Sequence, residues 1–130
     1  MGHSLPLGFV AIGVGAAMGA WARWGLSIWL NARLPHFPLG TLAANLIGGF
    51  LVGVGVAYFS RHTEISPVWP MLAITGFLGG LTTFSTYSAE VIGLIEAGDG
   101  LSAFLLAFTH LAGSLLLTAA GMAVYRQLAS

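Results

Sequence analysis

The 130-residue sequence contains no cysteine and no lysine, and only 6% of its residues are charged. Without cysteine, the chain cannot supply a disulfide, a thiolate nucleophile, an iron–sulfur cluster or a zinc–thiolate site. Its four basic residues are arginines spread along the chain and matched by four acidic residues, so no basic run predicts a surface for nucleic acid or anionic lipid. No nucleophile–base pair, phosphate-binding loop or metal-ligand spacing is visible, so the sequence does not support a soluble enzyme.

Apolar residues, in contrast, make up 57% of the chain. They form four segments of about the 20-residue length needed to cross a hydrocarbon core that is ~30 Å thick. These segments cover residues 5–30, 37–60, 69–95 and 101–125. We therefore expect an all-α integral membrane protein with four transmembrane helices in a single transmembrane domain, residues 1–130. The amino-terminal stretch MGHSLPLGF lacks the cationic part of a secretory signal, and we interpret it as the start of the first span.

The arginines give almost no basis for a single orientation in the membrane. With four spans, both termini share a side with the second loop, so Arg61 and Arg126 lie on one side and Arg33 on the other. Orientation normally follows an excess of basic residues on one side. Its near absence indicates insertion in both orientations, for which an antiparallel homodimer is the simplest closed assembly. Three pairs of small residues fit close helix packing, either between subunits or within one: Gly15 with Gly19, Gly49 with Gly53, and Gly76 with Gly80.

The third segment contains the strongest indication of a site. Its stretch Thr75–Glu90, TGFLGGLTTFSTYSAE, holds three glycines and seven hydroxyl side chains. Glycine weakens a helix and hydroxyls compete for its backbone groups. A break near mid-membrane is therefore predicted where Gly76, Gly79 and Gly80 are followed by Thr82 and Thr83. Irregular backbone at that depth is tolerated only where it is buried in protein or lines an aqueous path. The stretch therefore predicts a polar site, and a kinked continuous helix is the alternative.

Polar and aromatic side chains elsewhere in the spans can add to this site. Asn45 is compatible both with a ligand contact and with an interhelical hydrogen bond. Ser114 and Thr118 are four residues apart, so they can extend a hydroxyl track or bond to carbonyls of their own helix. Phe84 and Tyr87 share a face if the second half of the third span is helical, and their ring edges can either contact an anion or pack.

The remaining polar residues indicate more ordinary roles. We expect Glu90 in a vestibule near the end of the third segment and Glu96 in interfacial water. Arg23 is expected to snorkel to lipid phosphate, with attraction of anions to an entrance as the alternative. His110 is the one histidine deep in a segment. Because it has no second histidine at similar depth, we expect a packed, hydrogen-bonded residue and not a haem or metal ligand.

Three stretches together resemble the small fluoride channels of the Fluc/CrcB family. They are GAAMGAWARW in the first segment, GTLAANLIGGFLVG in the second and TGFLGGLTTFSTYS in the third. The fourth segment shares only the general character of the family's fourth span, through Ser114 and Thr118. The resemblance implies a fluoride-selective channel that exports fluoride passively and protects against its toxicity. It also implies an antiparallel, dual-topology homodimer with two pores in the inner membrane of a prokaryotic cell.

The resemblance implies roles for individual residues as well. Along the ion pathway it places Asn45, Phe84, Ser85, Thr86, Tyr87, Ser88, Ser114 and Thr118. Glu90 would lie in a vestibule and Arg23 at the aqueous entrance. The backbone carbonyls of Gly79 and Thr82 from both subunits would hold a structural sodium ion, a cation that suits hard oxygen ligands. Tyr87 stands where the family pattern has phenylalanine, which predicts conduction that is retained but altered.

Two other classes of membrane protein share this size. A small dual-topology multidrug exporter also has four spans, but its essential glutamate lies in the first span, where this sequence has none. A membrane anchor for a cytochrome or quinone enzyme would be recognised by a haem spectrum. The presence of only one histidine deep in a segment argues against this class, because a haem site would need a second partner at similar depth. Loss of fluoride without loss of chloride from liposomes would separate a fluoride channel from both.

Overall fold

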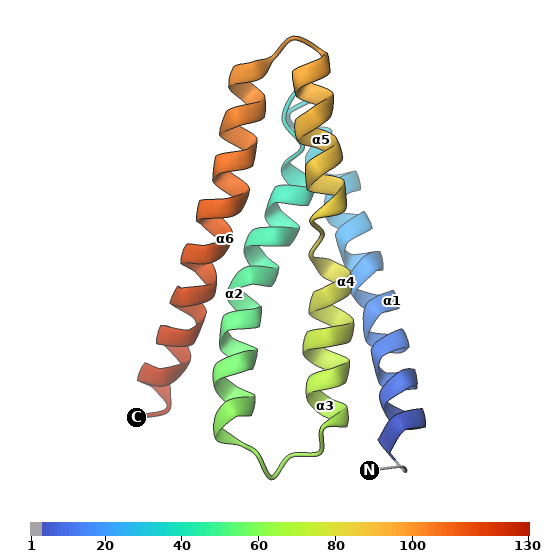
Figure 1. The fold of residues 1–130 in the computed structure, drawn as a ribbon, viewed down its shortest axis with the longest axis vertical. Coiled ribbons are helices and arrows are strands. Elements are labelled where there is room, and N and C mark those ends of the chain that lie inside the picture. Colours follow the sequence, from blue (N-terminus) through green and yellow to red (C-terminus); the bar gives the residue numbers. More distant parts are fainter. Residues whose placement is uncertain (1–3) are drawn as a thin grey trace.

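The computed structural model describes residues 4–130, which form helices and short connections and contain no β-strand (Figure 1). Three spans are continuous helices: α1 (Ser4–Asn31), α2 (Leu39–Arg61) and α6 (Gly100–Leu128). The third span is divided into α3 (Val68–Pro70), η1 (Met71–Leu78), α4 (Gly79–Leu81) and α5 (Ser85–Glu96). The first three residues of the stretch interpreted as the start of the first span lie outside the described residues.

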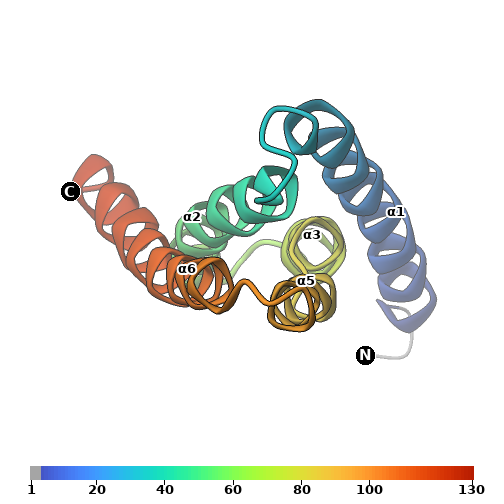
Figure 2. The ribbon, with the colours of Figure 1, turned by 90° about the horizontal axis from the view of Figure 1, so that it is seen from above.

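Four helical stretches are long and apolar enough to cross a membrane, which confirms the expected all-α, four-span architecture. They are Leu5–Asn31, Leu39–Arg61, Val68–Glu96 and Gly100–Leu128. The start of α1, the loop between α2 and α3, and the carboxyl end lie at one end of the molecule, and the α5–α6 connection lies at the other (Figure 1). Seen along the bundle, the third span stands between α1 on one side and the α2–α6 pair on the other (Figure 2).

The predicted break in the third span is present, and the alternative of a kinked continuous helix is wrong. The α4 helix ends at Leu81, and Thr82 has an extended backbone with φ −88° and ψ 155°. Helical structure begins again at Ser85. Before the break, η1 has the wider π-helical winding, which is rare in proteins and frequent near functional sites. The irregular backbone therefore lies between two helical halves of one span.

Glycines set the two closest helix packings, α1 against η1 and α4, and α2 against α6. A Cβ added at Gly19 would collide with the backbone carbonyl oxygen of Phe77, and one added at Gly53 would collide with that of Thr118. The same close approach to a neighbouring helix of this chain occurs at Gly15, Gly76 and Gly80, and a Cβ added at Gly49 would lie 3.2 Å from the carbonyl oxygen of Ser114. All three small-residue pairs of the sequence therefore pack within the subunit.

Replacing Gly19 by valine tests this packing. Because the colliding atom is a backbone oxygen that cannot rotate away, we expect Gly19→Val to lower stability by about 1–3 kcal/mol. The change would appear as a lower midpoint of thermal unfolding in detergent. The matched control is Gly25→Val on the same helix, where an added Cβ meets nothing within 4 Å. Equal midpoints for the two variants would contradict the assigned packing.

Candidate functional site

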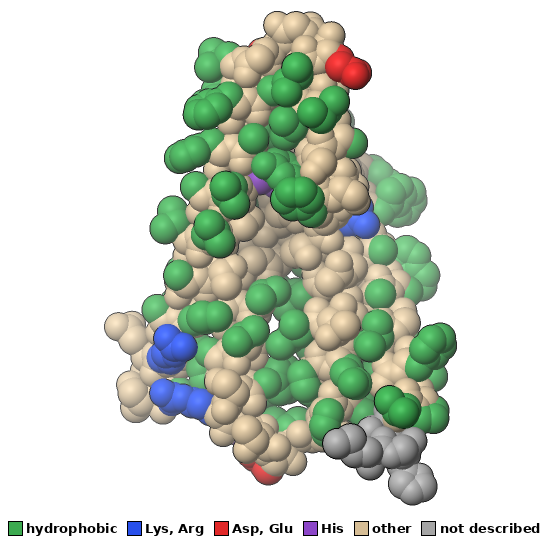
Figure 3. Space-filling model, in the orientation of Figure 1, with side chains coloured by type: hydrophobic (Ala, Val, Ile, Leu, Met, Phe, Trp, Pro, Cys, Tyr) green, Lys and Arg blue, Asp and Glu red, His purple; other side chains and the backbone are tan. Residues whose placement is uncertain are grey.

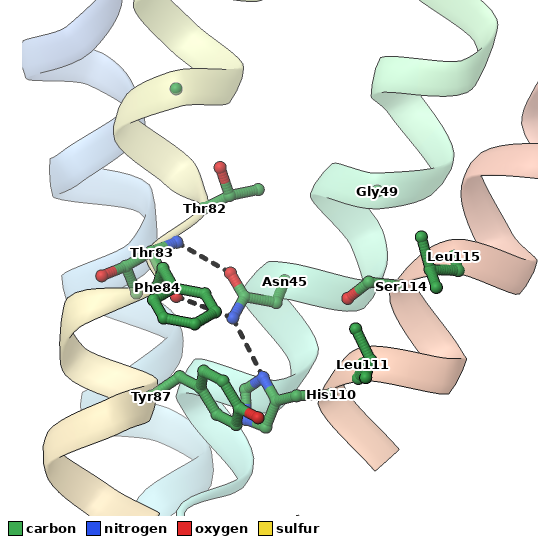
Figure 4. A pocket seen from close by; sticks show the side chains of 11 residues that line it. Asn45, Gly49, Thr82, Thr83, Phe84, Tyr87, His110, Leu111, Ser114 and Leu115 are labelled. Atoms are coloured by element: carbon green, nitrogen blue, oxygen red, sulfur yellow. Dashed lines mark hydrogen bonds between the residues drawn. The ribbon is translucent and has the colours of Figure 1, made fainter. Parts of the chain in front are cut away.

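A cavity of about 480 Å³ lies where the break in the third span faces α2 and α6 (Figure 4). Its walls combine amide, hydroxyl, imidazole and backbone groups with aromatic and leucine side chains. The lining residues are Asn45, Gly49, Gly79, Thr82, Thr83, Phe84, Tyr87, His110, Leu111, Ser114 and Leu115. Residues from three separate spans therefore meet around the break. Among the residues assigned to the ion pathway or the sodium site from the sequence, those on the cavity wall are Asn45, Gly79, Thr82, Phe84, Tyr87 and Ser114.

Asn45 bonds to both backbone groups of Thr83 in the break (Figure 4). Its Nδ2 donates to the carbonyl oxygen of Thr83 at 2.9 Å, and the N–H of Thr83 donates to Oδ1 of Asn45 at 2.8 Å. Without such partners, each backbone group at membrane depth would cost several kcal/mol. The structure thus gives Asn45 the interhelical bonding role that the sequence left open, and its contact with a ligand stays a prediction.

His110 continues this network into α6. Its Nδ1 lies 3.0 Å from Nδ2 of Asn45. Because the paired bonds to Thr83 orient the amide, Nδ2 is the donor and Nδ1 of His110 accepts, which assigns the proton of the neutral ring to Nε2. His110 is only 3% exposed, as expected for a packed and hydrogen-bonded residue. Its Nε2 is buried and has no hydrogen-bond partner among residues 4–130.

The two aromatic rings after the break meet edge to face. The centroids of Phe84 and Tyr87 are 5.3 Å apart, with an angle of 75° between the ring planes. Phe84 is 77% exposed, whereas Tyr87 packs on the ring of His110 with centroids 4.3 Å apart. The hydroxyl of Tyr87 donates to the carbonyl oxygen of Ala107 at 3.2 Å. The oxygen that distinguishes Tyr87 from phenylalanine is therefore bonded to α6.

The carbonyl oxygens of Gly79 and Thr82 are among those that the break leaves without their usual helical donors. In a continuous helix, the N–H of Thr83 would bond to Gly79, but here it donates to Asn45. The N–H of Thr86 would bond to Thr82, but it donates to Oγ1 of Thr83 at 3.2 Å. The carbonyl groups of Gly79 and Thr82 are thus released from the helical pattern. Hard oxygen atoms of this kind are suitable ligands for a cation such as sodium.

Arg23 reaches the end of the first half of the span. Its Nε donates to the carbonyl oxygen of Gly80 at 3.2 Å. A cation is favourable at the carboxyl end of a helix, where carbonyl groups lack intrahelical partners. Arg23 therefore stabilises the carboxyl end of α4, a contact that the sequence did not indicate. Its proposed place at an aqueous entrance is a separate prediction.

The other residues assigned to the pathway or its vestibules from the sequence lie outside the cavity lining. Oγ of Ser85 is 3.3 Å from Oγ1 of Thr83, beside the break. Oγ1 of Thr118 donates to the carbonyl oxygen of Gly49 at 3.0 Å, so it bonds to the neighbouring helix and not to its own. Thr86, Ser88 and Glu90 belong to α5.

Thr41 is a contact that the sequence did not reveal. Its Oγ1 donates to Oε2 of Glu90 at 2.7 Å, and Thr41 is only 1% exposed. The second carboxylate oxygen, Oε1, is buried without a hydrogen-bond partner among the described residues. Thr41 lies four residues before Asn45, so the two share a face of α2. That spacing is the feature of the sequence that could have identified it.

Comparison with known proteins places the whole arrangement in a family. The family model described as CrcB-like protein, Camphor Resistance (CrcB), matches residues 10–122. A protein of Cupriavidus taiwanensis named fluoride-specific ion channel FluC is 60% identical over 124 residues, which cover 95% of this chain and 98% of that protein. Proteins of the same name from Ralstonia pickettii and Pseudomonas putida are 58% and 56% identical, over 88% and 89% of this chain and 91% of each relative. The broken span and every residue around the cavity fall inside the matched region, and the chain belongs to the CrcB-like family.

Proposed function

We propose that this protein is a fluoride-selective ion channel that lets fluoride leave a prokaryotic cell passively across the inner membrane and so limits fluoride toxicity. The observation that carries the proposal is the cavity at the break, where polar groups from three spans meet inside an apolar bundle. The names of relatives that are 56–60% identical to the chain support the same function.

The groups on the cavity wall suit a small anion that must move on after binding. Fluoride holds its water firmly, so a dry path has to offer donors at short range in place of that water. The hydroxyl of Ser114 and the ring edges of Phe84 and Tyr87 are such donors. None of the lining residues within the described chain carries a full positive charge. Several weak sites in place of one strong site favour conduction over trapping.

The pathway in this proposal extends beyond the cavity in both directions. Besides Asn45 on the cavity wall, its members are Ser85, Thr86 and Ser88 on α5, and Thr118 on α6, with Glu90 and Arg23 in the vestibules. Several of these groups are already bonded within the chain; the hydroxyl of Thr118 bonds to Gly49, and the guanidinium of Arg23 bonds to Gly80. The hydroxyl of Thr118 and the guanidinium of Arg23 contribute to the pathway by exchanging these hydrogen bonds for hydrogen bonds to the passing fluoride.

We also propose that two copies associate as an antiparallel homodimer with two pores and a structural sodium ion between them. The exposure of Phe84, 77%, fits a ring that a second copy covers. The carbonyl oxygens of Gly79 and Thr82, released from helical bonding, are the groups that would hold the ion. Sodium would supply positive charge to offset the carbonyl oxygens that converge from both copies.

Ion flux from liposomes tests the function directly. Liposomes that contain only this protein should lose fluoride rapidly and retain chloride, whereas protein-free liposomes should retain both. Chloride is the matched halide because it is larger and less firmly hydrated. Loss of both ions at similar rates, or export of an organic cation driven by protons without fluoride loss, would refute a fluoride-selective channel.

Removing the side chain of Asn45 should disturb the break itself. Asn45→Ala leaves the backbone groups of Thr83 without partners, at a cost of about 1–3 kcal/mol each, and we expect a lower unfolding midpoint together with a loss of fluoride flux. Thr109→Val is the matched control, because the hydroxyl of Thr109 bonds only to the carbonyl of Leu105 in its own helix. Wild-type flux in Asn45→Ala would show that conduction does not require this network.

Tyr87→Phe tests the departure from the family pattern. The variant loses the hydrogen bond to Ala107, which is worth about 0.5–1.5 kcal/mol, so the ring is less firmly held against α6. We expect fluoride efflux to persist at a changed rate. Tyr125→Phe, far from the cavity at the carboxyl end of α6, should conduct like the wild type. Identical efflux rates for the wild type and Tyr87→Phe would show that this hydroxyl does not affect fluoride conduction.

A further inference from the structure

Arg61 and Arg126 are far apart in the sequence and close together in the fold. Arg61 is the last residue of α2, and Arg126 lies in the last turn of α6. Figure 3 shows arginine side chains next to each other over these two helix ends. The ends are held together by the rings of Tyr58 and Tyr125, which meet edge to face with centroids 5.8 Å apart. The fold thus creates a basic pair that no run of basic residues in the sequence indicates.

This basic pair has no anionic partner within residues 4–130. Both side chains are exposed, and no carboxylate of the described chain forms an ion pair with either one, including Glu64 in the loop after α2. Each guanidinium is favourable at the carboxyl end of its own helix. The helix ends do not remove the repulsion between two neighbouring positive charges. A bound anion that accepts hydrogen bonds from both arginines would do so.

An apolar cleft begins beside the basic pair. Its volume is about 380 Å³, and it is lined by Tyr58, Phe59, Ile65 and Trp69. Tyr58 belongs both to this cleft and to the aromatic contact that holds the two helix ends together. Tyrosine and tryptophan are enriched at the level of lipid headgroups. Tyr58 therefore joins the charged helix ends to this apolar cleft, whose aromatic residues are those expected where a phospholipid changes from headgroup to acyl chain.

We propose that this end of the molecule binds one anionic phospholipid, with its phosphate between Arg61 and Arg126 and an acyl chain in the cleft. The planar guanidinium presents paired N–H donors that match phosphate oxygens. The cleft favours a lipid over free phosphate, because only a lipid has apolar surface to bury there. The site is independent of the fluoride pathway, since neither arginine lines the cavity at the break.

Binding is tested in detergent with phosphatidylglycerol, phosphatidylcholine or inorganic phosphate added to the purified protein. Native mass spectrometry counts the bound lipid, and thermal unfolding reports stabilisation, because a ligand of the folded state raises the midpoint. We expect phosphatidylglycerol to bind and to raise the midpoint, and the other two to have little effect. Removing one arginine should weaken phosphatidylglycerol binding about tenfold, as for a hydrogen bond to a charged group.

The decisive comparison is Arg61→Gln/Arg126→Gln against Arg33→Gln, whose guanidinium lies over the ring of Trp29 at 5.3 Å. The double variant should lose the effect of phosphatidylglycerol, and the control should keep it. If the double variant does not fold, each single variant should show a partial loss. Equal binding of phosphatidylglycerol by the wild type and these variants, or equal shifts with phosphatidylcholine or inorganic phosphate, would overturn the proposal.

Fluoride efflux, measured in parallel in liposomes without anionic lipid, should persist in all variants. A failure of the lipid-site proposal is therefore separate from a failure of the channel proposal.

Discussion

The pair of hydrogen bonds between the amide of Asn45 and the backbone of Thr83 is the contact on which the site depends. A transmembrane helix can be interrupted only if the released N–H and C=O groups find partners inside the protein. One asparagine on α2 supplies both an acceptor and a donor in a single planar group. Its remaining donor then fixes the orientation of His110, so a structural bond also determines which imidazole nitrogen is left as a donor.

The same interruption converts ordinary helix groups into groups that can bind ions. Because Thr83 and Thr86 donate to side chains, the carbonyl oxygens of Gly79 and Thr82 are released from helical bonding, while Arg23 takes up that of Gly80. Close packing of α1 against the third span, made possible by glycines, keeps these groups in place without bulky side chains. Polar backbone groups at membrane depth thus have hydrogen-bond partners on neighbouring helices, and the groups without such partners remain at the cavity.

Much of this arrangement follows from local composition. Four apolar segments separated by short connections specify four helices, because the length of a span is set by the thickness of the hydrocarbon core. The glycines and hydroxyls from Gly79 to Thr83 specify the break, because they weaken a helix wherever it is placed. The partners of the break do not follow from composition. The spacing of Thr41 from Asn45 indicates a shared face but not the bond to Glu90, and the basic pair of Arg61 and Arg126 is not apparent until α2 and α6 are set side by side.

The sequence by itself determined the membrane class, the number of spans, the position of the break and the resemblance that led to the family, because hydropathy and glycine content act locally along the chain. Only the tertiary structure decided that Asn45 bonds to Thr83, that the hydroxyl of Tyr87 is held by Ala107, and that the small-residue pairs pack within one subunit. Each of these depends on which faces of distant helices meet. That choice is made by the shapes of all the packed side chains together, and no single segment contains it.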